Sequence, residues 1–211
     1  MKRFADLTYT APVVAAQQRN GSRDLAGRQQ LRAPPEGLGD REWTFILACE
    51  SCFMASTGPE GWPYVQHRGG RPGFLQPVGE DTLAMPDFRG NRQYVSVGNL
   101  DHDPRVSLIL VDYAARRRLK LMGFAERIEA ADAEPALVQR FAGLAGEVPV
   151  ERYLVIRVEA FDWNCPQHIP VLYSVAEVAT RIEPFARHIA HLESLLRGAG
   201  IEPPGAPTLA D

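Results

Sequence analysis

The sequence predicts a mainly β protein: a six- to seven-stranded antiparallel β-barrel with flanking helices. Short apolar stretches bounded by Gly, Pro, Asn or Asp recur through residues 52–113. Two longer stretches, residues 117–130 and 152–163, alternate apolar and polar side chains as half-buried strands do. Strands and helices do not alternate along the chain, so an antiparallel barrel is favoured over a parallel sheet.

The first half of the barrel is expected to consist of two hairpins preceded by helices. Residues 1–39 are polar and irregular, which indicates an N-terminal arm with one short helix near residues 11–20. Asp40 is the expected N-cap of a helix that ends at Ala48. Gly-rich turns then join two strand pairs: residues 52–56 with 62–67, and residues 74–78 with 82–85.

The second half is expected to contain the long strands. The elements in chain order are a short helix at 91–100, strands at 105–113 and 117–130, a helix at 132–145 and a last strand at 152–163. Gly123 allows the longest strand to bend. Asp132 is the expected N-cap of the second helix. These elements complete a barrel domain that spans residues 40–172.

Residues 173–200 are expected to form a separate amphipathic helical segment. Phe185, Ile189, Leu192 and Leu196 recur at spacings of four, three and four, which places them on one helical face. We expect this face to be buried against the barrel or a partner. The final residues, 201–211, are rich in Pro and Gly and are expected to be disordered.

Composition narrows the possible functions. A chain of 211 residues with a net charge of −3 offers no general electrostatic attraction for nucleic acid. No apolar run approaches the roughly 18 residues of a membrane span, and the first residues lack the apolar core of a signal peptide. A cytoplasmic protein that binds neither nucleic acid nor membrane is therefore expected. Between His67 and Lys120, nine Arg or Lys outnumber six Asp or Glu, which fits an anionic small molecule.

Cys49 and Cys52 match the Cys-x-x-Cys pattern, and Cys165 is the third cysteine. An odd number of cysteines without a secretory signal argues against a disulfide framework. The pair lies where a helix is expected to end and a strand to begin, whereas a thioredoxin-like pair would open a helix. Partly buried thiols are the favoured interpretation, with redox or metal chemistry as the alternative. No metal site is predicted.

The stretch from Trp62 to Leu100 is the most informative part of the chain. Arg68, Arg89 and Arg92 stand beside Gly-rich ends of expected strands. Gly lets backbone N–H groups approach a ligand closely, and Arg offers forked donors to phosphate. The stretch contains neither a P-loop nor a Rossmann glycine pattern. These residues indicate a phosphate-bearing ligand held at strand ends.

Several segments resemble those of the pyridoxamine 5′-phosphate oxidase-like superfamily of FMN-binding split barrels, in particular its uncharacterised flavin-nucleotide-binding branch. The matching segments are residues 68–74, 87–92, 98–100 with 104–106, 123–128 and 164–169. In the last segment His168 stands where Tyr is common. The order and spacing of the segments carry the resemblance, which covers about residues 40–172.

The resemblance implies a homodimer with two FMN molecules, each in a groove shared between the subunits, where flavin performs the redox chemistry. It implies that Arg89 and Arg92 clamp the 5′-phosphate, with Asn91 nearby. It further implies that Arg68 contacts the phosphate or the ring edge and that backbone groups of Met85 and Pro86 face the isoalloxazine. Arg118 stands where the oxidase has a Gln that contacts the flavin. Asn164 and Gln167 are implied to reach the flavin of the other subunit.

The leading hypothesis is therefore an FMN-dependent oxidoreductase acting on a small molecule, with NADH or NADPH as candidate electron donors. The substrate is unknown, and no catalytic acid or base is assigned. Oxidation of vitamin B6 is not favoured, because the oxidase's C-terminal Arg-x-His segment has no equivalent. The alternatives are a non-catalytic flavin carrier, or the same barrel binding a deazaflavin or haem. Haem would need an axial ligand such as His67, His188 or His191.

Overall fold

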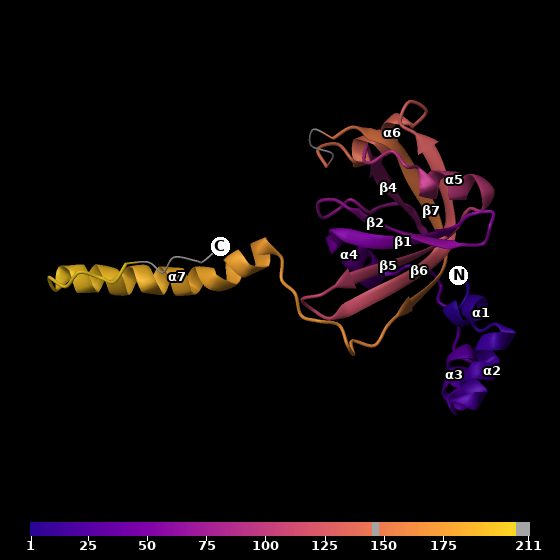
Figure 1. Ribbon diagram of the computed structural model, residues 1–211, viewed down its shortest axis with the longest axis horizontal. Helices are drawn as coiled ribbons and strands as arrows, with labels where there is room; N and C mark the ends of the chain where they lie inside the picture. The colour runs from indigo at the N-terminus through magenta and orange to yellow at the C-terminus, as the bar shows by residue number, and fades with distance from the viewer. Residues whose placement is uncertain (145–147, 206–211) are drawn as a thin grey trace. The chain divides into compact units, whose positions relative to one another are not determined.

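The computed structural model of the chain describes residues 1–144 and 148–205 and contains two units, Met1–Ile169 and Pro170–Asp211 (Figure 1). The first unit holds a β-sheet with helices α1 to α6 around it. The second holds the long helix α7. Among the described residues, no helix is both long and apolar enough to cross a bilayer.

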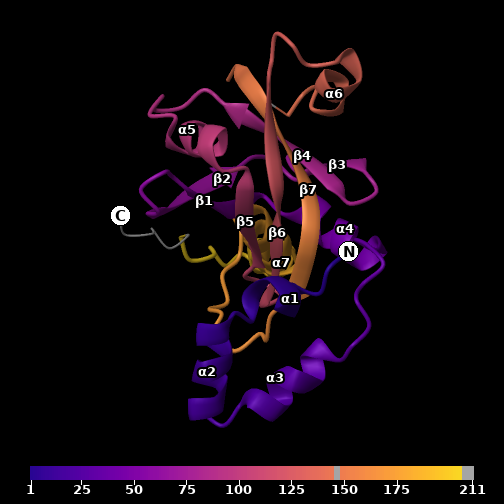
Figure 2. The same cartoon turned by 90° about the vertical axis from the view of Figure 1, so that its right-hand side faces the viewer.

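Within the described residues, seven antiparallel strands form one sheet in the order β2-β1-β5-β6-β7-β4-β3 (Figure 2). The strands are β1 (Ser51–Thr57), β2 (Pro63–Gly69), β3 (Gln76–Gly79), β4 (Thr82–Phe88), β5 (Arg105–Asp112), β6 (Arg117–Glu129) and β7 (Val150–Trp163). Although β2 and β4 are not neighbours in this order, Arg68 on β2 contacts Asp87 on β4. The sheet is thus curled into a barrel whose gap is spanned by side chains. The predicted mainly β, antiparallel barrel with flanking helices is confirmed.

The two longest strands carry the bend of the sheet. The register of β6 against β7 shifts between Met122 and Gly123, so that Glu159 on β7 has no opposite residue. A Cβ on Gly123 would overlap the carbonyl oxygen of Arg157. Only glycine allows the two backbones to approach this closely, and the bend predicted at Gly123 is confirmed.

Inward-facing side chains from every sheet region fill the barrel. Leu108, Leu121, Leu154 and Ile156 are at most 1% exposed, as the alternation of β5, β6 and β7 predicts. Helix α4 (Asp40–Ala48) adds Phe45 and Ile46 to the same core. The predicted cap of this helix is wrong by one residue: Gly39 is the N-cap, and its N–H donates to the Glu42 carboxylate at 3.1 Å.

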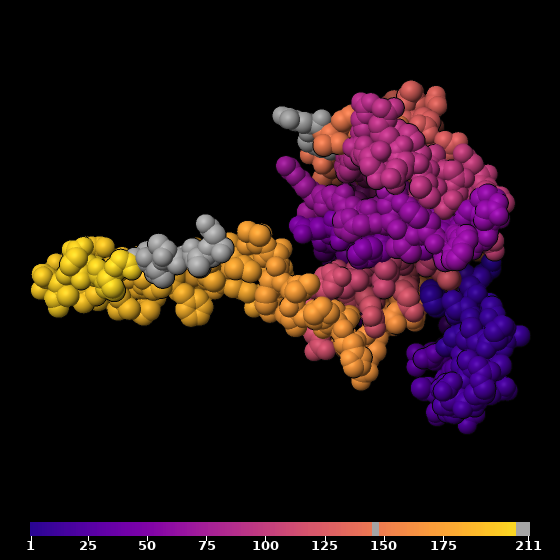
Figure 3. Space-filling model, in the orientation of Figure 1, coloured from indigo at the N-terminus to yellow at the C-terminus, as the bar shows by residue number. Residues whose placement is uncertain are grey.

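The N-terminal arm contains more helix than predicted. The expected helix is α2 (Ala11–Arg19), and α1 (Phe4–Thr8) and α3 (Arg23–Gln30) lie on either side of it. Figure 3 shows the arm in indigo, projecting from the barrel. The N–H of Lys2 donates to the carbonyl oxygen of Glu159, at the register shift of β7, at 2.9 Å. The arm is therefore anchored where the β6–β7 ladder leaves a carbonyl group free.

Two predicted helices have different bounds. Helix α5 runs from Val95 to His102 rather than over 91–100, because Arg92 and Tyr94 adopt left-handed backbone angles before it. Helix α6 (Pro135–Arg140) is capped by Glu134 rather than Asp132. Proline at a first helical position fixes where a helix begins. The predicted end of that helix, at residue 145, lies outside the described residues.

The second unit consists of α7 (Val175–Gly198) and the residues that flank it. Ser174 caps the helix: its hydroxyl oxygen accepts from the N–H of Glu177, whose carboxylate accepts from the N–H of Ser174. No side chain of α7 is buried, so burial of the predicted apolar face stays a prediction. Residues 201–205 form neither helix nor strand, and the rest of the predicted disordered tail lies outside the described residues.

We expect Gly123→Ala to lower the free energy of unfolding by about 1–3 kcal/mol, because its Cβ would force β6 away from β7. Urea denaturation measures this loss. The control is Gly98→Ala in α5, where a Cβ meets no atom within 4 Å. Helix propensity predicts that this variant is unchanged or up to about 1 kcal/mol more stable. Equal stability of the two variants would contradict the proposed role of Gly123.

Candidate functional site

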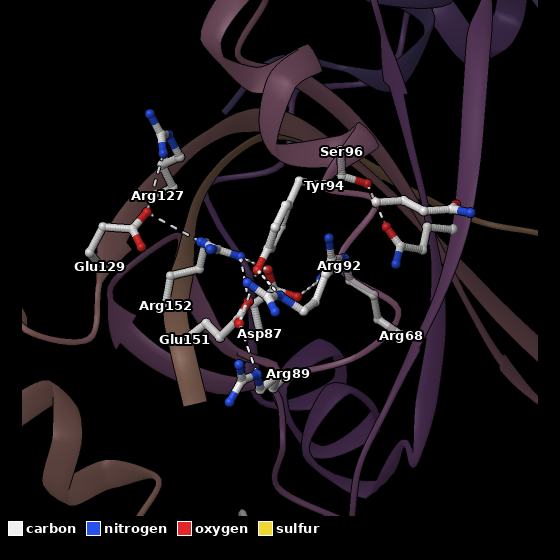
Figure 4. Close-up of polar contacts among 12 residues, drawn as sticks. Arg68, Asp87, Arg89, Arg92, Tyr94, Ser96, Arg127, Glu129, Glu151 and Arg152 are labelled. Carbon is white, nitrogen blue, oxygen red and sulfur yellow. Dashed lines mark hydrogen bonds and ion pairs between the residues drawn. The ribbon is translucent and has the colours of Figure 1, made fainter. Parts of the chain in front are cut away.

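A partly buried carboxylate, 14% exposed, joins three strands of the barrel. Asp87 on β4 accepts hydrogen bonds from Arg68 Nη1 on β2 at 2.6 Å and from Arg152 Nη1 on β7 at 2.8 Å (Figure 4). The two arginine side chains are 8% and 9% exposed. Each carboxylate oxygen thus receives one guanidinium donor, and two cations converge on one anion.

A second layer of polar contacts surrounds this group. Arg152 Nε donates to Glu129 at 3.2 Å. The Tyr94 hydroxyl donates to Glu151 at 3.1 Å and accepts from Arg92 Nε at 3.3 Å. The network ties the segment between β4 and α5 to the start of β7 (Figure 4).

A cavity of about 200 Å³ lies beside this network. It is lined by donor-rich side chains, among them Gln66, Arg68, Asn91, Arg92, Ser96 and Arg152. Three guanidinium groups in the lining outnumber its two carboxylates, Asp87 and Glu151, which favours an anionic group, and forked donors suit phosphate or carboxylate.

The backbone before α5 is strained where it meets the cavity. Arg92 has φ 60° and Tyr94 has φ 53°, in the left-handed region that non-glycine residues rarely adopt. Such strain is concentrated at functional sites, where the surrounding contacts hold it. Arg92, Tyr94 and the neighbouring Asn91 all line the cavity.

Three buried side-chain polar atoms of the described residues have no hydrogen-bond partner. They are Arg68 Nε, Arg118 Nε and Asn164 Oδ1. Buried polar groups are nearly always paired, so each such atom needs an explanation, of which a ligand is one. All three belong to residues that the sequence analysis assigns to a cofactor.

The structure divides the predicted site residues into two groups. Arg68, Asn91 and Arg92 line the cavity beside Asp87. Arg118 and Asn164 lie at the other end of the long strands: the N–H of Asn164 donates to the carbonyl of Arg118 at 3.1 Å, and Arg118 Nη2 donates to the carbonyl of Cys165 at 3.4 Å. Exposed Gln167 follows in the same segment. Within one chain, this second group does not line the cavity.

The remaining predicted residues are placed differently. Met85 is fully buried in β4 and Pro86 is buried beside it, so only their backbone is available to a ligand. The pairing of β3 with β4 reaches Ala84, just before both residues. Arg89 is half-exposed, with its Nε 3.7 Å from a Glu151 oxygen, and it does not line the cavity.

Sequence reasoning missed the acidic centre of the site. Asp87 falls within a segment that resembles the family, where no role is predicted for it, and Arg152 is predicted only as a strand residue. One signal was available for Asp87, a single charged residue near the end of the otherwise apolar strand β4. The pairing of Asp87 with Arg152 joins residues 65 positions apart and could not be read from local pattern.

The Cys-x-x-Cys pair is buried at the junction of α4 and β1. Cys49 and Cys52 are free thiols, and burial raises the pKa of each to about 12. A thiol with so high a pKa is protonated at neutral pH and is a poor nucleophile. The interpretation as buried thiols is confirmed. Cys165 is also free and is exposed.

The comparisons with known proteins agree with this architecture. The sequence pattern of the pyridoxamine 5′-phosphate oxidase family matches residues 40–164. No curated protein matches the chain.

Similar solved structures include HupZ from Group A Streptococcus (14% identity, 64% of this chain and 99% of that one, TM-score 0.47). An F420 reductase gives 18% identity, 62% and 98% coverage and a TM-score of 0.42. A conserved hypothetical protein from Mycobacterium tuberculosis is 17% identical over 68% of this chain and 97% of that one, with a TM-score of 0.45. At this identity and TM-score, the similar structures do not indicate what the chain binds.

We expect Asp87→Ala to lower the free energy of unfolding by about 3–5 kcal/mol, because it leaves the buried Arg68 without its anion and removes one of the carboxylates that pair with the buried Arg152. Urea denaturation monitored by tryptophan fluorescence measures the change. The control is Glu183→Ala, which removes the exposed ion pair with Arg187 and is expected to cost about 0.5 kcal/mol or less. A small effect at Asp87 would show that the contact does not hold the barrel closed.

Proposed function

The chain belongs to the pyridoxamine 5′-phosphate oxidase family, and on that premise we propose that it is an FMN-binding oxidoreductase. In this proposal two copies form a homodimer and each flavin lies in a groove between them. The observation that carries the proposal is the set of unpaired buried atoms on Arg68, Arg118 and Asn164. Binding of one polar cofactor would give all three atoms a partner.

The phosphate end of the cofactor fits the cavity beside Asp87. Arg68 and Arg92 offer charge-assisted hydrogen bonds, and Asn91 belongs to the same lining. Asp87 occupies only part of the Arg68 guanidinium, and the Nε of that group remains available. The cation that closes the barrel is therefore also a donor for the ligand.

The size of this cavity favours a shared site. Sites for small molecules and cofactors usually measure roughly 300–1,000 Å³, whereas this cavity measures about 200 Å³. It has room for a phosphate group and adjoining atoms, so the flavin ring must be covered by other residues. Arg118, Asn164 and Gln167 lie outside the cavity and carry polar groups, so they are candidates for these contacts.

A symmetric dimer would bring the two groups together. In a twofold interface, every contact from one subunit to the other occurs twice. Two grooves would then form, each with Arg68, Asn91 and Arg92 from one subunit and Arg118, Asn164 and Gln167 from the other. FMN would supply hydride or electron transfer, while these side chains bind and orient it. A small-molecule substrate, with NADH or NADPH as candidate donors, would reach the ring from the same groove.

Mass spectrometry of the ligand released from purified protein tests the cofactor directly, and we expect the mass of FMN. Arg92→Ala should weaken FMN binding by about 10- to 150-fold, the equivalent of a charged hydrogen bond worth about 1.5–3 kcal/mol. The control is Arg28→Ala, which removes an exposed arginine on α3 and should leave the Kd unchanged. A deazaflavin or haem mass would overturn the FMN assignment. FMN without anaerobic reduction by NADH or NADPH would favour a carrier or another donor.

Mixing two defective variants tests the shared groove. We expect Arg92→Ala and Arg118→Ala each to bind FMN weakly as homodimers. In a mixed dimer, one groove would carry both substitutions and the other neither. Random mixing of subunits should thus restore tight binding to about a quarter of all grooves, as twofold symmetry requires. Titration of the mixture with FMN counts these sites. If mixing restores none, the two arginines do not meet across subunits.

A further inference from the structure

The apolar residues of α7 follow a stricter pattern than simple amphipathicity. Their positions differ by three and four residues in regular alternation: Val175, Val178, Ile182, Phe185, Ile189, Leu192 and Leu196. The first six are 88%, 41%, 56%, 69%, 55% and 45% exposed. A repeat that averages 3.5 residues is the spacing of a coiled-coil seam, in which seven residues make two turns.

This helix lacks the support that helices usually have. It is 24 residues long, none of its side chains is buried, and Pro184 stands in its interior. An interior proline costs a helix about 3 kcal/mol, and most helical stability in proteins comes from packing of the apolar face. The apolar face of α7 therefore needs a partner surface of matching length and spacing.

We propose that α7 forms a parallel, two-stranded coiled coil with α7 of a second copy of this chain. Val175, Ile182, Ile189 and Leu196 take the a positions, and Val178, Phe185 and Leu192 take the d positions. β-Branched residues at a favour two parallel strands. Pro184 falls at position c, outside the seam.

The polar residues beside the seam select the parallel orientation. Arg181 and His188 occupy g positions, and Glu193 occupies an e position. In a parallel pair, a g residue faces the e residue five positions later on the other helix. His188 of one copy then faces Glu193 of the second copy, and this contact occurs twice. An antiparallel pair would instead place g positions against each other and bring the basic side chains of Arg181 and His188 together.

The coiled coil is independent of the flavin site, since it uses residues of the second unit alone. It would hold two copies together whether or not cofactor is bound. If the barrels also contact each other, the coiled coil would make that contact effectively intramolecular, because it raises the local concentration of one barrel near the other.

Disulfide cross-linking of the full-length protein tests both pairing and orientation. In a Cys165→Ser background, which removes the exposed native thiol, Val178→Cys and Leu192→Cys are prepared as separate variants. Both substitutions lie at d positions, which face their own counterparts in a parallel coil. We expect each variant, on mild oxidation, to form a covalent dimer on a non-reducing gel, at least tenfold faster than the control Thr180→Cys, which lies at an outer f position.

The outcomes separate the alternatives. Covalent dimers of Val178→Cys and of Leu192→Cys, with little from Thr180→Cys, would support the parallel coil. Cross-links that form only when the first two variants are mixed would indicate an antiparallel pair and overturn the proposal. No cross-link in either variant, or equal cross-linking at position 180, would also overturn it. FMN binding by these variants is not at issue, so failure here leaves the proposed flavin site standing.

Discussion

The barrel depends on one anion placed between two buried cations. Asp87 holds Arg68 and Arg152, so side chains close the sheet where β2 and β4 form no ladder. Burying two arginines and much of Asp87 removes hydration from these charges, and a buried ion pair contributes little net stability unless its geometry is good. Apolar residues could fill the same space. An ionic closure has another property: it leaves guanidinium donors at the cavity wall, which an apolar closure would not.

The same arrangement explains why structure and ligand binding are hard to separate here. Arg68 is both a contact across the split and a donor toward the cavity. Loss of Arg68 would disturb the closure and the ligand together. Arg92 is exposed, and among the described residues its guanidinium hydrogen-bonds only to Tyr94, so its loss leaves the contacts of Asp87 in place. The strained backbone beside Arg92 adds a cost that is consistent with a functional position.

The parts of the fold that were predictable are those set by local chemistry. A short apolar run located β5, alternation located β6 and β7, and Gly123 marked the bend. Arginine and glycine in one stretch pointed to Arg68, Asn91 and Arg92, which do share a cavity. The pairing of Asp87 with Arg152 was not predictable, because it depends on how distant strands meet. Helix α1 was missed because it is only five residues long, and α3 was missed because its residues are mostly polar.

The register shift in β7 also determines how the N-terminal arm is attached. Glu159 has no residue opposite it, so its carbonyl oxygen accepts from Lys2, and its carboxylate also pairs with the Lys2 ammonium group at 2.9 Å. The arm thus bonds to groups of Glu159 that are unpaired in the β6–β7 ladder, and it replaces no hydrogen bond between the two strands. The attachment is modular: the arm could be shortened, exchanged or lost while the β6–β7 pairing stays intact. Substitutions in the arm can therefore leave this strand pairing unchanged, even though Met1 packs against the barrel core and Phe4 lies beneath Lys120 of β6.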